Sequence, residues 1–242
     1  FPGKPIGDIL GKPMVQMVYE QAQKASLVHD VVIATDDKRI YDVVLGFGGN
    51  AVMTSPSHNS GTDRVAEVVK NLDCDIVVNI QGDEPLIPPE NIDLVIEPLL
   101  ARDDLSVSTL MIAIHKSSEM LDPDICKVVV DNAGCALYFT RAPIPYNRDF
   151  DYIEETYSDP KINLNKRILG FKHIGIYAYK KSFLPQFINM KVSKLENSEK
   201  LEQLRILENR YLIQLVETKQ NSIGVDRPED IDKVIKAMNG KN

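Results

Sequence analysis

The stretch Asp-Ile-Val-Val-Asn-Ile-Gln-Gly-Asp-Glu-Pro at residues 75–85 joins an apolar run to a polar turn. Its first six residues are typical of a buried strand, and the polar residues Gln81 and Asp83 follow where that strand ends. In an open α/β sheet, ligands bind at the carboxyl ends of the strands, and Gly82 lets the backbone approach a ligand closely. Asp83 is therefore placed to hold a divalent cation against a phosphate. A simple turn after a strand explains this segment equally well.

Helices and strands alternate on the N-terminal side of this segment. Apolar spacing predicts helices at residues 13–25, 40–47 and 65–72 and strands at residues 31–34 and 51–53. The alternation predicts an α/β fold, with a mostly parallel sheet flanked by helices and joined by right-handed crossovers. Because the chain starts inside a turn, we expect a strand upstream of Phe1 to complete the first unit.

The second half of the chain has a different pattern. We predict strands at residues 107–114, 127–130, 136–139, 171–179 and 212–216, a helix at 195–207 with Leu195, Leu201, Leu204 and Leu207 on its inner face, and a terminal helix at 228–238. Asp-Asn-Ala-Gly at residues 131–134 is typical of a hairpin turn, and residues 148–167 form a polar excursion. We therefore expect a single domain over residues 1–242, with an antiparallel lobe inserted at about 126–175.

Composition excludes several classes of protein. The chain has 28 basic and 35 acidic residues and a formal charge of −7, which argues against nucleic acid as a partner because phosphate backbones need a basic surface. No apolar stretch approaches the roughly 20 residues that span a bilayer. The three cysteines are odd in number and lack metal-ligand spacing, so we expect reduced thiols in a cytoplasmic protein.

Polar residues at loops of the N-terminal half are candidates for a site, each with a structural alternative. Lys4 lies in a proline-flanked turn and can meet a phosphate, but it can also be an ordinary surface lysine. Residues 59–64 join a strand to a helix. Ser60 or Thr62 can cap that helix, whose N–H groups and Arg64 can bind an anion or a base; capping with nothing bound fits as well.

The C-terminal half adds further candidates. Arg141 follows a strand beside two prolines, whereas a lone strand histidine such as His173 is more often a hydrogen-bonded core residue than a catalytic one. Glu199, Glu202 and Arg205 have the spacing of surface pairs on one helix. Asp226 can cap the last helix, or it can join Asp83 on one cation. Spacing alone does not decide whether these two aspartates meet.

Short motifs in a fixed order, from end to end, give the chain a resemblance to the 3-deoxy-manno-octulosonate (Kdo) cytidylyltransferases. They are Phe-Pro-Gly-Lys-Pro at 1–5, Gly-Lys-Pro-Met at 11–14, Ala-Thr-Asp at 34–36, Ser-Gly-Thr-Asp-Arg at 60–64, Gln-Gly-Asp-Glu-Pro at 81–85, Lys-Val-Val-Val-Asp at 127–131, Ala-Leu-Tyr-Phe-Thr-Arg at 136–141, His-Ile-Gly-Ile-Tyr at 173–177, Leu-Glu-Gln-Leu-Arg at 201–205 and Gly-Val-Asp-Arg-Pro-Glu-Asp at 224–230. The number and order of these motifs make the resemblance far more specific than any one of them.

The resemblance implies a Rossmann-like nucleotidyltransferase that transfers CMP from CTP to Kdo, releases pyrophosphate and supplies lipopolysaccharide synthesis. It places Mg²⁺ on Asp83 and Asp226 and Lys4 on the phosphates. It also implies substrate-binding roles for the following residues: Ser60, Thr62 and Arg64 at the cytidine end; Gln81, Arg141, His173 and Glu199 or Glu202 at the sugar acid; and Tyr177 and Arg205 within matching motifs. A homodimer formed through the inserted lobe is implied as well.

Two departures from the family pattern keep alternatives open. Members carry an initial strand and an Ala-Arg-x-x-Ser-Ser/Thr-Arg stretch before the position of Phe1, and many carry Thr at the position of Arg227. The second departure resembles relatives that act on 8-amino-Kdo, so a cytidylyltransferase for that sugar or another acidic sugar is one alternative. A non-catalytic nucleotide- or sugar-binding protein is the other. A retaining glycosyltransferase fits less well, because such sheets present Asp-x-Asp where this chain has Gln-Gly-Asp.

Overall fold

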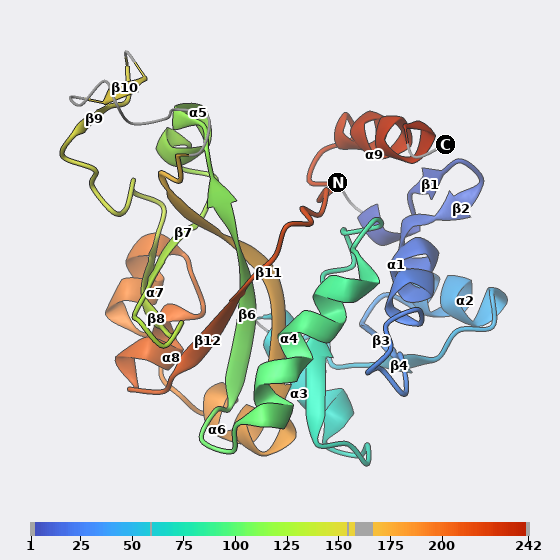
Figure 1. Cartoon of the computed structure of the whole chain (residues 1–242). Coiled ribbons are helices and arrows are strands. Elements are labelled where there is room, and N and C mark those ends of the chain that lie inside the picture. The colour runs from blue at the N-terminus through green and yellow to red at the C-terminus, as the bar shows by residue number, and fades with distance from the viewer. Residues whose placement is uncertain (1–2, 59, 154, 158–166, 241–242) are drawn as a thin grey trace.

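A mixed β-sheet flanked by helices forms the centre of the molecule (Figure 1). The structure, a computed structural model, describes residues 3–58, 60–153, 155–157 and 167–240. The predicted α/β class is confirmed. Parts of three predictions lie outside the described residues: residues 1–2 of the motif at 1–5, Asn59 of the loop at 59–64, and residues 154 and 158–166 of the polar excursion.

The central sheet has six strands in the order β12-β6-β11-β7-β8, with β5 also paired to β11. The strands are β5 (Ile76–Asn79), β6 (Val107–Ile114), β7 (Lys127–Val130), β8 (Ala136–Thr140), β11 (Gly170–Lys180) and β12 (Ile213–Glu217). β12 runs parallel to β6, whereas β11 is antiparallel to β5, β6 and β7. One edge of β11 pairs with β7 near its start and with β5 near its end. This long strand therefore joins the hairpin β7–β8 to the rest of the sheet.

The N-terminal elements follow the predicted alternation. They are η1 (Lys4–Ile6), β1 (Asp8–Ile9), β2 (Lys12–Pro13), α1 (Met14–Ala22), β3 (Ile33–Thr35), α2 (Lys38–Gly46), β4 (Ala51–Met53) and α3 (Gly61–Val69). β3 pairs in parallel with β4. Between β3 and β5 lies a groove of about 830 Å³, lined by Val32, Ala34, Ile76 and Val78 among others. This groove separates the β3–β4 pair from the central sheet in the described part of the chain, and the strand expected upstream of Phe1 stays a prediction.

Helix α4 (Pro89–Ala101) was not predicted from the sequence. Proline-rich flanks and Pro98 inside the helix hide it, although a proline in the first turn is compatible with a helix. Ile92, Val95, Ile96 and Leu99 are buried on the face that packs against β6 and β11. Other short elements also lacked a prediction: α5 (Ser117–Leu121), β9 (Phe150–Asp151), β10 (Thr156–Tyr157), η3 (Lys181–Phe183) and α6 (Leu184–Ile188).

The predicted helix over residues 195–207 is wrong. The chain forms two short helices, α7 (Lys194–Glu199) and α8 (Leu204–Glu208), because Lys200 adopts the left-handed conformation with φ 56° and ends α7. Leu201 and Leu204 are buried as expected, but Leu195 is exposed. The last helix, α9 (Asp230–Asn239), is close to its prediction. No helix in the described ranges has both the length and the apolar character needed to cross a membrane.

Candidate functional site

Lys4, Asp83 and Asp226 meet in space, although they come from three distant parts of the chain. Lys4 opens η1, Asp83 follows β5, and Asp226 lies in the loop that leads from β12 to α9. The Lys4 Nζ atom donates to Asp83 Oδ2 at 2.7 Å and to Asp226 Oδ1 at 3.4 Å. The backbone N–H of Val225 donates to the carbonyl of Asp83 at 2.9 Å, so the two aspartate loops are also joined through the backbone.

The charges of this trio support one another. Burial lowers the pKa of Lys4, but the hydrogen bond with Asp83 and the negative charges of Asp83 and Asp226 outweigh burial and raise the pKa above its ordinary value. The Asp226 side chain is 85% exposed and the Asp83 side chain 26% exposed, so both carboxylates remain open to further ligands. The lysine therefore stays protonated and holds the two carboxylates on either side of one positive charge.

Glu84, the next residue after Asp83, is a buried carboxyl group to which the sequence did not assign a role. Burial raises the pKa of Glu84, and the charges on Asp83 and Asp226 act in the same direction. Its Oε2 atom has no hydrogen-bond partner among the described residues. Burial and the two neighbouring negative charges thus make the charged form of Glu84 less favourable than that of an exposed glutamate.

The donor set of the trio fits a hard divalent cation. Two carboxylates already face one cation, the Lys4 ammonium, and carboxylate oxygens are the protein ligands that Mg²⁺ prefers. No group of three or more His, Cys, Asp or Glu side chains suited to a metal occurs in the described parts of the chain. A cation held here thus takes only one or two protein ligands, as is usual for Mg²⁺ sites that share phosphate and water oxygens.

The start of α3 carries three predicted residues, and each one has a partner in the protein. The Ser60 hydroxyl caps α3 by accepting from the N–H of Asp63 at 3.1 Å. The Thr62 hydroxyl donates to Glu202 Oε2 at 2.8 Å. Arg64 donates to Asp36 Oδ2 at 2.9 Å and to the hydroxyl of Thr54, and so joins the ends of β3 and β4. The structure thus brings Thr62, predicted at the cytidine end, against Glu202, predicted at the sugar end.

Glu199 and Arg141 form a second cluster. Glu199 accepts from the Thr140 hydroxyl at 2.6 Å and from the N–H of Arg141 at 2.9 Å. The Arg141 guanidinium donates to the carbonyls of Glu199 and Pro123, both at 3.0 Å. Burial raises the pKa of Glu199, but these hydrogen bonds and the nearby Arg141 charge lower it overall. Glu199 therefore stays ionised and fixes the position of Arg141.

His173 lies on β11 between two aromatic rings. Its imidazole contacts the Phe139 and Tyr177 rings at centroid distances of 5.3 and 5.2 Å. Burial lowers the pKa of His173 to about 3, so the ring is neutral near pH 7. The Thr109 hydroxyl donates to the carbonyl of Ile176 at 2.6 Å and lies 2.9 Å from His173 Nε2. Because that hydroxyl has only one proton, His173 Nε2–H donates to it, and Nδ1 is left as an acceptor.

The Tyr177 hydroxyl is a buried polar group without a partner among the described residues. Burial is the main reason why the pKa of Tyr177 is raised well above its ordinary value, so the hydroxyl stays protonated and can donate. A buried polar atom of this kind normally has a partner.

Two other predicted residues lie apart from these clusters. Arg205 forms a charged pair with Glu196 at 2.6 Å, and its guanidinium lies over the Phe187 ring at 5.2 Å. The structure thus places it in the packing between α7 and α8. Gln81 is exposed at the end of β5, two residues before Asp83. The sequence predicted that Glu199, Glu202 and Arg205 form surface pairs along one helix. They do not share a helix, because α7 ends at Glu199.

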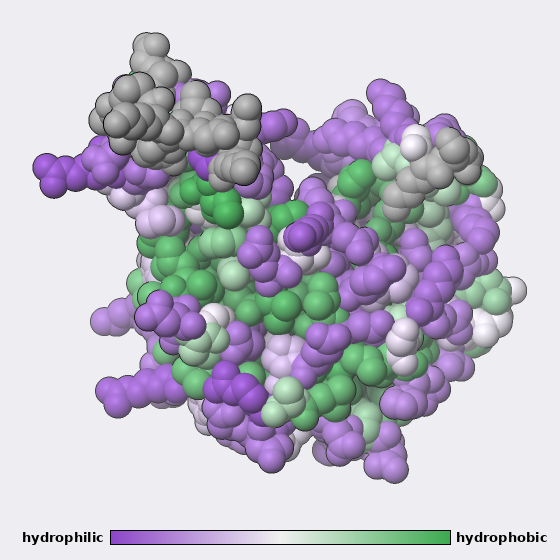
Figure 2. All heavy atoms as spheres, in the orientation of Figure 1, coloured by the Kyte–Doolittle hydropathy of each residue, from purple (hydrophilic) through white to green (hydrophobic). Residues whose placement is uncertain are grey.

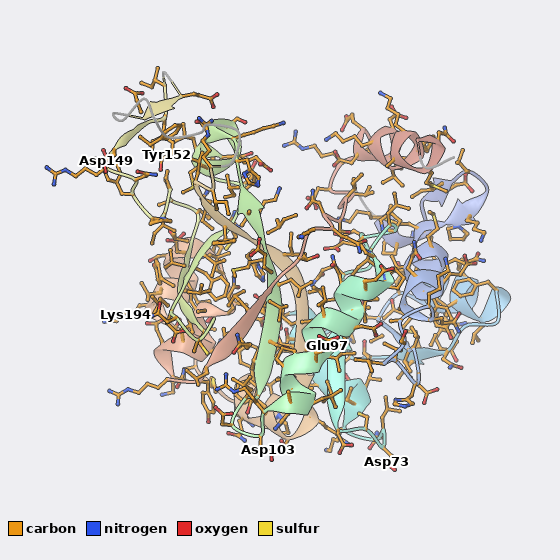
Figure 3. All side chains as sticks on the ribbon, viewed as in Figure 1. Asp73, Glu97, Asp103, Asp149, Tyr152 and Lys194 are labelled. Atoms are coloured by element: carbon orange, nitrogen blue, oxygen red, sulfur yellow. The ribbon has the colours of Figure 1, made fainter. Side chains whose placement is uncertain are left out.

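The loops that carry Asp83 and Asp226 meet where β5 ends. Figure 2 shows a hollow between the part of the surface that belongs to α5 and β9 and the part that belongs to α9. The loop that leads from β12 to α9, and that carries Asp226, lies on the α9 side of this hollow (Figure 1). Asp73, just before β5, and Asp103, just after α4, lie at the opposite end of the molecule (Figure 3).

Sequence patterns did not identify several residues that form hydrogen bonds with the predicted ones. Thr109, Thr140 and Glu196 hold His173, Glu199 and Arg205, respectively. Thr109 and Tyr177 are opposite each other in the β6–β11 ladder, so only the strand register reveals Thr109. Glu196 had a local signal, since Ser193 and Glu196 form a capping box at the start of α7.

Comparisons with known proteins identify the family of the chain. A cytidylyltransferase family model matches residues 1–218. A 3-deoxy-manno-octulosonate cytidylyltransferase from Geotalea daltonii is 51% identical over 98% of this chain and 92% of its own length. A solved structure of CMP:2-keto-3-deoxy-manno-octonic acid synthetase with CTP is 40% identical and covers 100% of this chain and 94% of its own, with a TM-score of 0.88. A 4-diphosphocytidyl-2C-methyl-D-erythritol synthase from Anaerococcus prevotii, 12% identical over 97% of this chain and 93% of its own, has a TM-score of 0.59 and shares the fold alone.

Proposed function

Because the chain belongs to the 3-deoxy-manno-octulosonate cytidylyltransferase family, we infer that it transfers CMP from CTP to Kdo and releases pyrophosphate. The observation that carries this proposal is the meeting of Lys4, Asp83 and Asp226 at the end of the sheet. In the reaction, the anomeric hydroxyl oxygen of Kdo forms a bond to the α-phosphorus of CTP. The bond from that phosphorus to the pyrophosphate oxygen breaks, and the hydroxyl proton leaves to solvent or a base.

The protein contributes mainly charge and orientation to such a transfer. Negative charge spreads over phosphate oxygens in the transition state, and positive groups held in place beforehand stabilise it without reorganisation. Lys4 is such a group, since two carboxylates keep it protonated and positioned. The transfer needs no covalent intermediate on a protein side chain.

We propose Mg²⁺ as the cofactor, held by Asp83 and Asp226. The ion, when bound, offsets charge on the phosphates and on the leaving pyrophosphate. Lys4 now lies between the two carboxylates, so its ammonium must give up at least one of them to a cation and can then turn to a phosphate. The exposure of Asp226 and the single-atom contact at 3.4 Å favour this exchange.

The groups around His173 support a sugar-acid site. The neutral imidazole offers Nδ1 as an acceptor and Tyr177 offers a hydroxyl donor, which suits the hydroxyl groups of a sugar. Arg141 lies close by on the hairpin side and suits a carboxylate. Ser60 and Arg64, at the start of α3, then face the nucleotide, whereas the buried Thr62 contacts Glu202 instead of a substrate. Under this proposal Gln81 lies between the sugar-acid end and the nucleotide end of the site.

We also propose that two copies of the chain associate through the lobe at residues 126–175. The product, CMP-Kdo, would serve lipopolysaccharide synthesis, and the enzyme would act in the cytoplasm. Large apolar side chains of this lobe are exposed, including Leu137 at 62%, Tyr146 at 79% and Ile153 at 89%. Exposed apolar groups that gather in one region are typical of an interface. Light scattering tests the dimer, and Leu137→Glu should yield monomers if the proposal is right.

The test of the function is CTP-dependent release of pyrophosphate by the full-length protein with Kdo and Mg²⁺. The same assay with 8-amino-Kdo and a sialic acid covers the alternative sugars. We expect turnover with Kdo, and none with CTP alone. Turnover with another sugar acid but none with Kdo contradicts the proposed substrate. CTP binding without turnover of any sugar acid would favour a binding protein.

A further inference from the structure

Residues 199–202, here called the acidic strut, connect two distant parts of the proposed site. At one end of the strut, Glu199 accepts from the N–H of Arg141 at 2.9 Å and from the Thr140 hydroxyl at 2.6 Å. At the other end, Glu202 accepts from the Thr62 hydroxyl at 2.8 Å. One short segment thus contacts both the hairpin that carries Arg141 and the helix start that carries Thr62.

The strut is held firmly in place. The left-handed backbone of Lys200 turns the chain sharply between the two glutamates, and the Lys200 N–H donates to the Glu196 carbonyl at 2.8 Å. The paired Glu196 and Arg205 side chains, only 12% and 11% exposed, connect α7 to α8 on either side of the strut. A displacement of Glu202 is therefore transmitted to Glu199, because the intervening backbone has little freedom.

The Thr62 side chain uses its hydroxyl in the contact with Glu202. It is 3% exposed, and its hydroxyl is the only polar group of the side chain, so it does not reach a substrate directly. It lies in the first turn of α3, next to the Ser60 cap. Any ligand that fixes the start of α3 fixes Thr62 and, through the hydrogen bond, Glu202.

We propose that Thr62 and Glu202 are positioning residues that couple the nucleotide end of the site to Arg141 at the sugar-acid end. This inference rests on the proposed function for the identity of the two substrates. CTP bound at the start of α3 stabilises the Thr62–Glu202 contact, and the strut then holds Arg141 in place for the sugar acid. The coupling is reciprocal, so the sugar acid strengthens CTP binding by the same factor.

Initial rates over a grid of CTP and Kdo concentrations measure this factor. Thr62→Val removes the hydroxyl while keeping the shape of the side chain, and we expect it to reduce the factor about tenfold, the lower end for a hydrogen bond to a charged group. The change should show in the KM for Kdo, with kcat at saturating substrates reduced much less. Thr62→Ser retains the hydroxyl and should stay within about twofold of the wild type.

A double-mutant cycle assigns the effect to the contact. Thr62→Val, Glu202→Ala and the double variant should reduce the coupling factor to the same extent, because each removes the same hydrogen bond. Glu202→Gln keeps an acceptor and should retain most of the coupling. The proposal is overturned if the coupling factor of the double variant falls by the product of the two single losses. It is also overturned if Thr62→Val leaves the coupling factor unchanged. Thermal unfolding of each variant checks that the fold persists.

A second measurement separates this inference from the proposed function. Hydrogen exchange of the wild-type protein with CTP alone should show slower exchange at the Arg141 amide and over residues 199–206, and Thr62→Val should lose this protection. The readout needs no sugar acid. Absence of turnover with Kdo therefore contradicts the proposed function only, whereas CTP binding without protection at Arg141 contradicts the strut only.

Discussion

The two charged clusters of the site are built in opposite ways. In the first, Lys4, Asp83 and Asp226 come from loops, and the Asp226 side chain is 85% exposed. In the second, the glutamates of α7 and the strut each accept hydrogen bonds from partly or fully buried partners. The first cluster can exchange its Lys4–Asp226 contact for a ligand at little cost, because Asp226 is exposed and exposed pairs contribute little stability. The second cannot, because breaking a buried pair leaves an uncompensated charge.

This difference suggests that the two clusters have different roles. Under the proposed function, the exposed cluster would act on the phosphates, and the buried cluster would preserve the shape of the sugar-acid end. Substitutions in the first should therefore affect turnover more than stability. Substitutions in the second should affect stability first.

The largest effect is expected for Asp83→Asn. Loss of this carboxylate removes a ligand of the proposed cation, and we expect kcat to fall by about 10³-fold, the scale of losing one preorganised electrostatic group. The melting temperature should change little, because the Lys4–Asp83 pair is partly exposed. Pyrophosphate release and thermal unfolding measure the two effects.

Two further variants control this prediction. Asp226→Asn should show a loss of the same kind if the two aspartates share one cation. Asp73→Asn alters an exposed aspartate at the opposite end of the molecule and should leave turnover unchanged (Figure 3). Near-normal activity of Asp83→Asn would remove Asp83 from the metal site.

The next effect concerns the stability contributed by the buried Glu196–Arg205 pair, which connects α7 to α8 on either side of the strut. Arg205→Met leaves Glu196 without its partner, and we expect the free energy of unfolding to fall by about 3 kcal/mol, as for other broken buried pairs. Urea unfolding measures it. Arg102→Met is the matched control, because Arg102 pairs with the exposed Asp104 and its loss should matter much less. Equal losses in both variants would contradict the contrast between exposed and buried pairs.

The pH dependence of stability should reveal His173. The folded-state pKa of about 3 lies below the ordinary value, so the unfolded chain binds a proton at this imidazole at a pH where the folded chain does not. The stability contribution is complete above about pH 6.5 and is lost as the pH falls toward 3, by at most about 1.4 kcal/mol per pH unit.

His173→Gln tests this assignment. Unfolding experiments between pH 7 and pH 4 should show a shallower loss of stability in the variant than in the wild type. His29→Gln alters an exposed histidine and should keep the wild-type slope. Identical slopes for all three proteins would mean that His173 takes up a proton in the folded state.

The smallest effect is expected at Lys200. A left-handed backbone is costly for a side chain with a Cβ atom and costs nothing for glycine, but glycine also gains freedom in the unfolded chain. Lys200→Gly should therefore stabilise the protein by less than about 1 kcal/mol. Lys200→Val should destabilise it, because a β-branched residue fits this conformation poorly. The order of the two melting temperatures checks the prediction.

Sequence patterns predicted the exposed cluster better than the buried one. Asp83 and Asp226 sit in short motifs at loop positions, and the family resemblance paired them; the structure brings both to Lys4, and their roles stay a prediction. The Thr62–Glu202 contact depends on where the strut packs against α3, for which no local pattern exists. The leucine spacing over residues 195–207 predicted one helix because the break occurs at a lysine, not at the glycine or proline that usually marks it.

Sequence patterns also left the pairing of the sheet undetermined. Alternating residues identified β11 as a strand, but they say nothing of its direction or of its neighbours on either edge. Helix α4 was missed because prolines at residues 88, 89 and 98 outweighed its apolar face. Long-range packing decides both features.

The wide separation of Lys4, Asp83 and Asp226 in the sequence has a consequence for biosynthesis. A growing chain completes the central sheet with β12, which ends at Glu217, before Asp226 has been added. A nascent chain at that stage has one of the two carboxylates of the trio and lacks the backbone contact from Val225. Premature termination in this window should therefore yield a chain with a complete sheet and no CTP turnover, so incomplete products would not consume the nucleotide.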